Sequence, residues 1–155
     1  MPDEEKKPEA SAVKADPAAV HLGPNWKHPR PLAACRFDPS GKYIFTGAEE
    51  NVVTRWDIAT GTASSLAGHD SWVRALAFSP SGDTVYSGGY DGRILWWPAA
   101  ADKPEPTRKL DPAHNGWVRA LAVSPDGTRL ASCGNDKLVK LWDTAEGKLI
   151  AELAG

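Results

Sequence analysis

The stretches GHDSWVRALAFSPSG, residues 68–82, and LASCGNDKLVKLWD, residues 130–143, hold the pattern that decides the fold. Both recur in the chain. When three histidines are aligned, a proline, a glycine and a later tryptophan also fall into register. Each histidine precedes its tryptophan by 28 residues: the pairs are His28 and Trp56, His69 and Trp97, and His114 and Trp142. The chain therefore contains three units of fixed internal register.

Each unit has the pattern of short strands. In the middle unit, RALAF leads into SPSG, and the combination of Ser or Asp, then Pro, with Gly in the fourth place is typical of a type I turn. Such a turn joins two antiparallel strands. The second strand is TVYSG; a polar corner, GYDG, and a third strand, RILWW, follow, and a weaker fourth segment precedes the next histidine. Helical periodicity is absent. The sequence predicts an all-β fold of β-propeller blades, each of four antiparallel strands.

These motifs, with the sister copies AHNGWVRALAVSPDG and TGAEENVVTRWD, resemble the WD-repeat, or G-beta-repeat, family of β-propellers. The resemblance covers about residues 18–155, with repeats at about 28–68, 69–113 and 114–155. Residues 1–17 are rich in Pro, Ala, Glu and Lys, so we expect a flexible tail. The chain departs from the family pattern at Pro98, where the family has Asp, and at Lys27, where Gly is usual.

A serine, a histidine and an aspartate in one unit raise the question of a catalytic triad. The resemblance implies instead a structural relay of buried hydrogen bonds, in which a hydroxyl accepts from the indole N–H and a carboxylate orients the imidazole. A hydrolase would need one exposed nucleophile and an oxyanion site, so we expect no catalytic residue. We expect Glu50, one methylene longer than Asp, to strain or open its relay. The relay sets are His114, Ser132, Asp136 and Trp142; His69, Ser87, Asp91 and Trp97; and His28, Thr46, Glu50 and Trp56.

Trp72 and Trp117 each follow a motif histidine by three residues, where the chain enters the first strand of a unit. They either cap the edge of the core or belong to a contact surface. The resemblance implies that partners dock on the face that bears these entry loops and the corners between second and third strands. Aromatic residues flanked by polar groups are typical of interface hot spots. The face so assigned includes Asp70, Trp72, Tyr90, Asn115, Trp117, Asn135, Pro31 and Glu49. We expect Arg74 and Arg119 to pair with carboxylates of neighbouring blades.

Composition argues against several classes of partner. The formal net charge is −2 and the pI is about 6.1, without a basic run, so we expect no nucleic acid partner. No apolar run approaches the ~20 residues of a transmembrane helix, and the first residues lack the apolar core of a secretion signal. We therefore expect a cytoplasmic protein that binds no membrane. Cys35 and Cys133 lie far apart at apolar-patterned positions, so we expect buried free thiols, no metal site and no cofactor.

The number of blades is too small for a closed ring. Propellers have about four to eight blades, and this chain supplies three repeats. Ala75 and Ala77 alternate with Leu76 and Phe78, so each blade is apolar on two faces, and two faces would stay bare. Residues 18–22 could form a fourth strand for one further blade. We expect a fragment of a larger propeller, and closure by homo-oligomerisation is the alternative.

The sequence therefore predicts a non-catalytic binding module, a WD-repeat scaffold for protein–protein interaction with a protein or peptide partner. An accessory domain that positions substrates or partners in a larger enzyme is a second possibility. A propeller with a central polar pocket for a small ligand is disfavoured, because the first strands offer only Arg36, Arg74 and Arg119 as ionisable groups.

Overall fold

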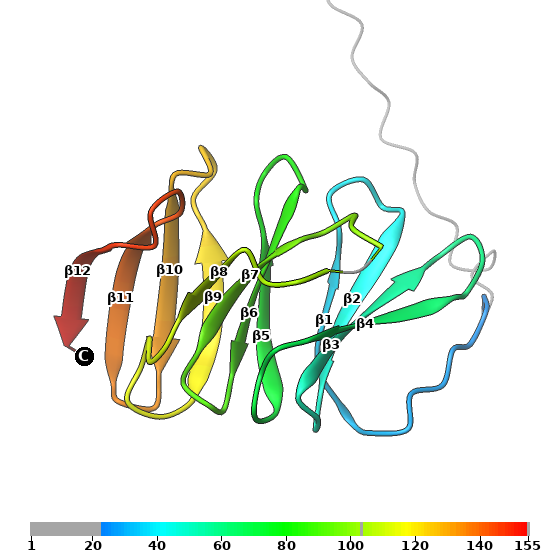
Figure 1. The fold of residues 1–155 in the computed structure, drawn as a ribbon, viewed down its shortest axis with the longest axis horizontal. Helices are drawn as coiled ribbons and strands as arrows, with labels where there is room; N and C mark the ends of the chain where they lie inside the picture. Colours follow the sequence, from blue (N-terminus) through cyan, green and yellow to red (C-terminus); the bar gives the residue numbers. More distant parts are fainter. Residues whose placement is uncertain (1–22, 103, 155) are drawn as a thin grey trace, which may run out of the picture.

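All regular elements of the computed structural model, which describes residues 23–102 and 104–154, are β-strands. They form three four-stranded antiparallel sheets, each paired in chain order, which we call blades 1, 2 and 3 (Figure 1). Blade 1 contains β1 (Leu32–Phe37), β2 (Tyr43–Ala48), β3 (Val52–Asp57) and β4 (Ala63–Ala67). Blade 2 contains β5 (Val73–Phe78), β6 (Thr84–Gly89), β7 (Ile94–Pro98) and β8 (Arg108–Leu110). Blade 3 contains β9 (Val118–Val123), β10 (Arg129–Gly134), β11 (Leu138–Asp143) and β12 (Leu149–Ala154).

This arrangement confirms the predicted all-β fold of four-stranded blades. The expected tail at residues 1–17 and the expected strand at residues 18–22 lie outside the described residues. In the part of the chain that is described, no helix is long and apolar enough to span a bilayer.

Tight turns at one end of each blade set the register of its first hairpin. The N–H of Gly82 donates to Ser79 O over 2.9 Å, and the N–H of Gly127 donates to Ser124 O over 2.9 Å. Gly82 has a φ of +81°, a left-handed conformation that glycine adopts without strain. The turn pairs Phe78 with Val85, which places the entry loop and the next corner together at the opposite end of the hairpin.

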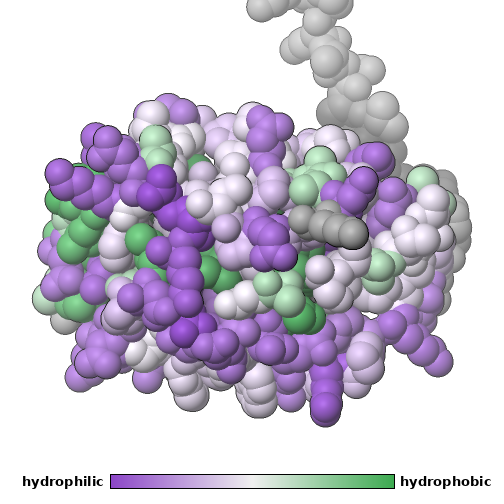
Figure 2. Space-filling model, in the orientation of Figure 1, coloured by the Kyte–Doolittle hydropathy of each residue, from purple (hydrophilic) through white to green (hydrophobic). Residues whose placement is uncertain are grey.

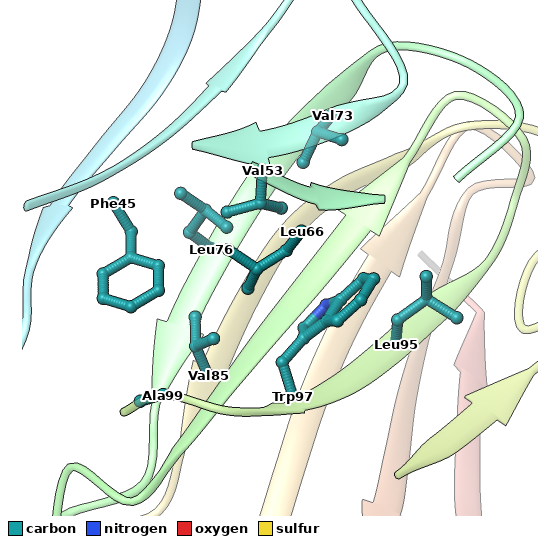
Figure 3. Close-up of a cluster of buried hydrophobic side chains, with 9 residues drawn as sticks. All are labelled: Phe45, Val53, Leu66, Val73, Leu76, Val85, Leu95, Trp97 and Ala99. Carbon is teal, nitrogen blue, oxygen red and sulfur yellow. The ribbon is translucent and has the colours of Figure 1, made fainter. Parts of the chain in front are cut away.

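The blades stand side by side and bury apolar side chains between them (Figure 1). Figure 3 shows the cluster between blades 1 and 2, where side chains of β2, β3 and β4 meet those of β5, β6 and β7. Its members are Phe45, Val53, Leu66, Val73, Leu76, Val85, Leu95, Trp97 and Ala99. Ala75, by contrast, belongs to the cluster between blades 2 and 3. The predicted two-sided character of the blades is therefore confirmed.

The residue before the motif tryptophan, Arg55 in blade 1 and Trp96 in blade 2, donates hydrogen bonds across a blade boundary. In blade 1, Arg55 Nη1 donates to Ala99 O over 2.8 Å and to Ala101 O over 2.9 Å. In blade 2, Trp96 Nε1 donates to Thr144 O over 3.1 Å. Each bond reaches the loop that follows the third strand of the next blade. These bonds fix the blades against one another and satisfy backbone carbonyls that would otherwise be partly buried without a partner.

The outward faces of the two end blades remain open. On blade 1, Leu32 is 51% exposed and Phe37 is 65% exposed; on blade 3, Val139 is 43% exposed. Figure 2 shows hydrophobic residues gathered at its left end, where β11 and β12 lie. The expectation of buried thiols is wrong, because Cys35 is exposed and Cys133 is partly exposed. Their positions in the repeat face a neighbouring blade, and in this chain neither position has one.

Candidate functional site

Blade 3 contains a continuous relay of four side chains beneath its entry loop. Trp142 Nε1 donates to Ser132 Oγ over 2.8 Å, and Ser132 Oγ lies 2.7 Å from His114 Nε2. His114 Nδ1 lies 2.9 Å from Asp136 Oδ1. A proton on Nδ1 lets the imidazole donate to the carboxylate and accept from the hydroxyl, so every polar group in the relay is satisfied.

Blade 2 repeats the same relay. Trp97 Nε1 donates to Ser87 Oγ over 2.8 Å, Ser87 Oγ lies 2.8 Å from His69 Nε2, and His69 Nδ1 lies 2.9 Å from Asp91 Oδ2. The relay joins the entry loop to β6, the corner after it and β7. It therefore braces one end of the blade.

The hydroxyls are in no position to attack a substrate. Ser87 is 0% exposed and Ser132 is 2% exposed, and each hydroxyl is already engaged by a tryptophan and a histidine. Burial and full engagement favour a structural role over nucleophilic catalysis. Among residues 23–102 and 104–154, no group of three or more His, Cys, Asp or Glu side chains is placed to hold a metal ion.

The relay carboxylates also hold the loops at this end of the blades. Asp136 accepts hydrogen bonds from the N–H of Asn115 over 3.1 Å and from the N–H of Leu138 over 3.2 Å. Burial of Asp136 disfavours its charged form, but the bonds from His114 and the backbone outweigh this effect and lower the pKa of the carboxyl. The carboxylate therefore stabilises the fold above its ordinary pKa of 3.8, and this stabilisation disappears as the pH falls through the lower folded-state pKa.

The relay of blade 1 is open. Trp56 Nε1 donates to Thr46 Oγ1 over 3.0 Å, as in the other blades. His28 does not join this pair: its Nε2 lies 3.1 Å from Glu50 Oε1, and its Nδ1 accepts from the N–H of Arg30 over 3.1 Å. The nitrogen that would meet the hydroxyl is thus occupied by the longer carboxylate.

Ala48 supplies a second reason for the displaced histidine, and sequence reasoning missed it. The corresponding residues of the other blades are Gly89 and Gly134, where an added Cβ would lie 2.6 Å from His69 Nδ1 and 2.4 Å from His114 Nδ1. A methyl group at this position therefore excludes the histidine from its usual place. The signal in the sequence is the replacement of glycine by alanine two residues after the hydroxyl.

Above the relays, the entry loops and corners meet as the repeat predicts. The N–H of Tyr90 donates to Trp72 O over 2.8 Å, and the N–H of Asn135 donates to Trp117 O over 2.8 Å. In blade 1 the N–H of Glu49 donates to Pro31 O over 3.1 Å. Asp70 and Asn115 lie on the same loops, where their N–H groups donate to the relay carboxylates. The eight residues assigned to the face thus lie at one end of the three blades.

Three aromatic rings form a stack on this face. The ring centroids of Tyr90 and Trp117 are 4.1 Å apart and nearly parallel, and those of Tyr90 and Trp72 are 5.5 Å apart. Trp72 is 42% exposed and Trp117 is 40% exposed. The rings support one another across the boundary between blades 2 and 3 while much of their surface stays accessible to solvent.

Arg119 does not pair with a carboxylate of a neighbouring blade, so that expectation is wrong. Its guanidinium lies 4.8 Å from the centroid of the Trp117 ring and donates from Nη2 to Asn135 Oδ1 over 2.8 Å. Trp117 lies two residues earlier, immediately before β9, and the face of its indole attracts the cation.

The first strands of the blades border a small hollow. It has a volume of about 110 Å³, and its charged lining residues are Arg36, Arg74 and Arg119. Pockets for small molecules typically measure about 300–1,000 Å³, so this hollow gives little support to a small-ligand function.

The repeats match a known family model. The model described as "WD domain, G-beta repeat" matches residues 26–57, 61–98 and 104–143. The chain belongs to the WD40 repeat family. The resemblance found in the sequence is thereby confirmed, and solved WD40 structures share the fold of this WD40 chain.

Relatives of this WD40 chain include nuclear distribution proteins. Nuclear distribution protein PAC1 of Tuber melanosporum is 36% identical over 63 residues, which cover 41% of this chain and 14% of that protein. The PAC1 protein of Arthroderma otae is 29% identical over 89 residues, which cover 57% of this chain and 19% of that protein. The match thus spans less than a fifth of either relative.

Among solved structures, U3-55K superposes with a TM-score of 0.77 and 25% identity, covering 83% of this chain and 41% of that one. The WD40 repeats of RRP9 superpose with a TM-score of 0.77 and 25% identity, covering 83% of this chain and 40% of that one. This chain therefore corresponds to about two fifths of each of these solved chains.

Proposed function

We propose that this WD40 chain is a non-catalytic binding module that serves as a scaffold for protein–protein interaction. The observation that carries the proposal is the exposed stack of Trp72, Tyr90 and Trp117 on the face of entry loops and corners. Rigid aromatic side chains with polar neighbours are enriched at the energetic centres of protein interfaces. The burial of Ser87 and Ser132 supports the non-catalytic part.

The proposed partner is a cytoplasmic protein or peptide rather than nucleic acid. A formal net charge of −2 provides no overall attraction for a phosphate backbone, which supports this choice. Membership in the WD40 repeat family supports a protein partner.

Affinity capture with the tagged 155-residue chain tests the proposal. We expect the double variant Trp72→Ala, Trp117→Ala to retain its partner at least about tenfold more weakly, because truncation of hot-spot aromatics costs roughly 2 kcal/mol or more. Quantitative mass spectrometry of the captured proteins gives the measurement. Ser81→Ala is the matched control, since Ser81 lies in the turn at the far end of the same hairpin. Equal capture by the double variant and the control would show that the face is wrongly assigned.

The open faces of the end blades support a second candidate, a propeller closed by association with a second copy. At the boundary between blades 1 and 2, Val73 and Leu76 pack against blade 1, and the face of blade 2 toward blade 3 carries the smaller Ala75. The open face of blade 1 carries the larger side chains Leu32 and Phe37, and on the open face of blade 3 the first strand carries Ala120 and Ala122. Such faces are complementary head to tail, and two copies would supply a ring of six blades.

Sedimentation velocity at several concentrations tests this association. We expect the sedimentation coefficient of the 155-residue chain to rise with concentration, because burial of Leu32 and Phe37 removes apolar surface from water. Phe37→Ser should shift the rise to at least several-fold higher concentration. The contact between copies must differ somewhat from the contact between blades 2 and 3. Cys133 of blade 3 holds the position of Gly88 in blade 2, where an added Cβ would lie only 2.5 Å from Val118 of the next blade. A compact monomer at every concentration would rule out closure by a second copy.

A further inference from the structure

The aromatic stack on the entry-loop face has two different ends. At the blade 3 end, the Arg119 guanidinium lies 4.8 Å from the Trp117 centroid, and Asn135 Oδ1 accepts a hydrogen bond from it. Tyr90 occupies one side of the Trp117 ring at 4.1 Å, so the guanidinium occupies the other side. The stack is therefore closed at this end by a cation that a side-chain oxygen holds in place.

The blade 1 end offers a side-chain oxygen without a cation. Glu49 holds the same position of the repeat as Tyr90 and Asn135. The N–H of Val73 donates to Glu50 O over 3.2 Å, which places the corner that carries Glu49 beside the entry loop of blade 2 and hence beside Trp72. Tyr90 covers one side of the Trp72 ring, and the indole is still 42% exposed.

The charged groups near Glu49 pair with one another, so the carboxylate of Glu49 is free to bind a cation. Glu50 pairs with His28 over 3.1 Å, and Asp70 pairs with Arg93. Within the described ranges, Glu49 has no ion pair and no cation lies over Trp72. One end of the stack thus already holds the chain's own arginine, and the other end pairs an uncovered indole with an unpaired carboxylate.

We propose that Trp72 and Glu49 form a binding site for a cationic side chain, a lysine or an arginine, on a peptide segment of the partner. The inference rests on the proposed function and specifies the chemistry of the partner. The negative face of the indole attracts a cation, and the carboxylate beside it adds a Coulombic attraction that disfavours acidic segments. The arrangement around Trp117 shows that a ring of this stack accepts a guanidinium.

Two matched peptides test the site: one has a single lysine between neutral residues, and the other has norleucine in its place. Each is titrated into the ¹⁵N-labelled 155-residue chain, and two resonances are followed: the indole N–H of Trp72 and the backbone N–H of Tyr90, which donates to Trp72 O and remains in the Trp72→Leu variant. We expect a saturable shift with the lysine peptide and at least a several-fold smaller one with the norleucine peptide. Glu49→Gln should weaken lysine-peptide binding about five-fold, and Trp72→Leu should abolish it. Glu146→Gln removes an exposed carboxylate from the loop between β11 and β12 and should leave binding unchanged.

Equal responses to the two peptides, or equal binding by the Glu49→Gln and Glu146→Gln variants, would overturn the cationic site. If partner capture still depends on Trp72 and Trp117 in that case, the proposed function stands and only the partner chemistry is wrong. If lysine peptides bind at Trp72 but capture ignores both tryptophans, the site is upheld and the assigned interaction face is wrong.

Discussion

Trp97→Ala is expected to lower the free energy of unfolding by about 3–5 kcal/mol, the usual cost of truncating a large buried aromatic residue. The indole is 0% exposed and lies in the cluster between blades 1 and 2 (Figure 3). Its Nε1 is the donor to Ser87 Oγ, and an added Cβ on Gly68 would lie only 2.7 Å from its ring. The substitution therefore opens a cavity in tight packing and leaves the relay hydroxyl without its donor.

Urea unfolding followed by circular dichroism measures this loss, because the signal does not depend on the tryptophan that is removed. Domains have total stabilities of about 5–15 kcal/mol, so a loss of about 5 kcal/mol would leave a domain at the lower end of that range about half unfolded. Trp72→Ala is the matched control: this exposed indole should contribute about 1 kcal/mol or less through its contact with Tyr90. Equal losses in the two variants would contradict a special role for the boundary between the blades.

The sequence predicted the strands and blades because the information is local and repeated. The turn SPSG and its copies fix the first hairpin of each blade, and the alternation of Ala75 with Leu76 identifies two buried faces. The members of the relays in blades 2 and 3 were implied by the resemblance to the WD-repeat family, and the structure brings them within hydrogen-bond distance. The comparison of three copies indicated which residues lie close together in space, and the pattern of one strand does not contain this information.

The sequence was less informative where a contact depends on the space around one atom. Ala48 differs from glycine by one methyl group, and only the position of the imidazole shows that this group excludes His28 from the relay. The sequence suggested that Arg119 pairs with a carboxylate, but its contact with Trp117 depends on the orientation of the indole ring, which the sequence does not give. Cys35 has the pattern of a core residue, and its exposure follows from the absence of a neighbouring blade on that side.

Ser132→Ala is expected to lower the free energy of unfolding by about 1–3 kcal/mol, because it leaves buried polar groups without partners. Both Trp142 Nε1 and His114 Nε2 lose the hydroxyl that lies 2.8 Å and 2.7 Å away, and His114 is 2% exposed. Neither group can recover its hydrogen bond from bulk water without opening the blade. The midpoint of urea unfolding should therefore fall while the slope of the transition stays constant.

The open relay of blade 1 provides an internal comparison for this variant. Thr46→Ala removes the hydroxyl at the same position of the repeat, but there no histidine loses a partner, since His28 is bonded to Glu50; the bonds lost are the one from Trp56 and a long one, of 3.5 Å, to Thr54 O. Trp56 is also less completely buried than Trp142, so solvent can satisfy part of its N–H. The loss should thus be smaller than in Ser132→Ala, and Ser132→Thr, which keeps the hydroxyl that blade 1 uses, should recover most of the stability. If Ser132→Ala and Thr46→Ala lower the free energy of unfolding equally, the histidine adds nothing to the stability of the relay. An unchanged urea midpoint in Ser132→Ala would show that the relay does not stabilise the fold.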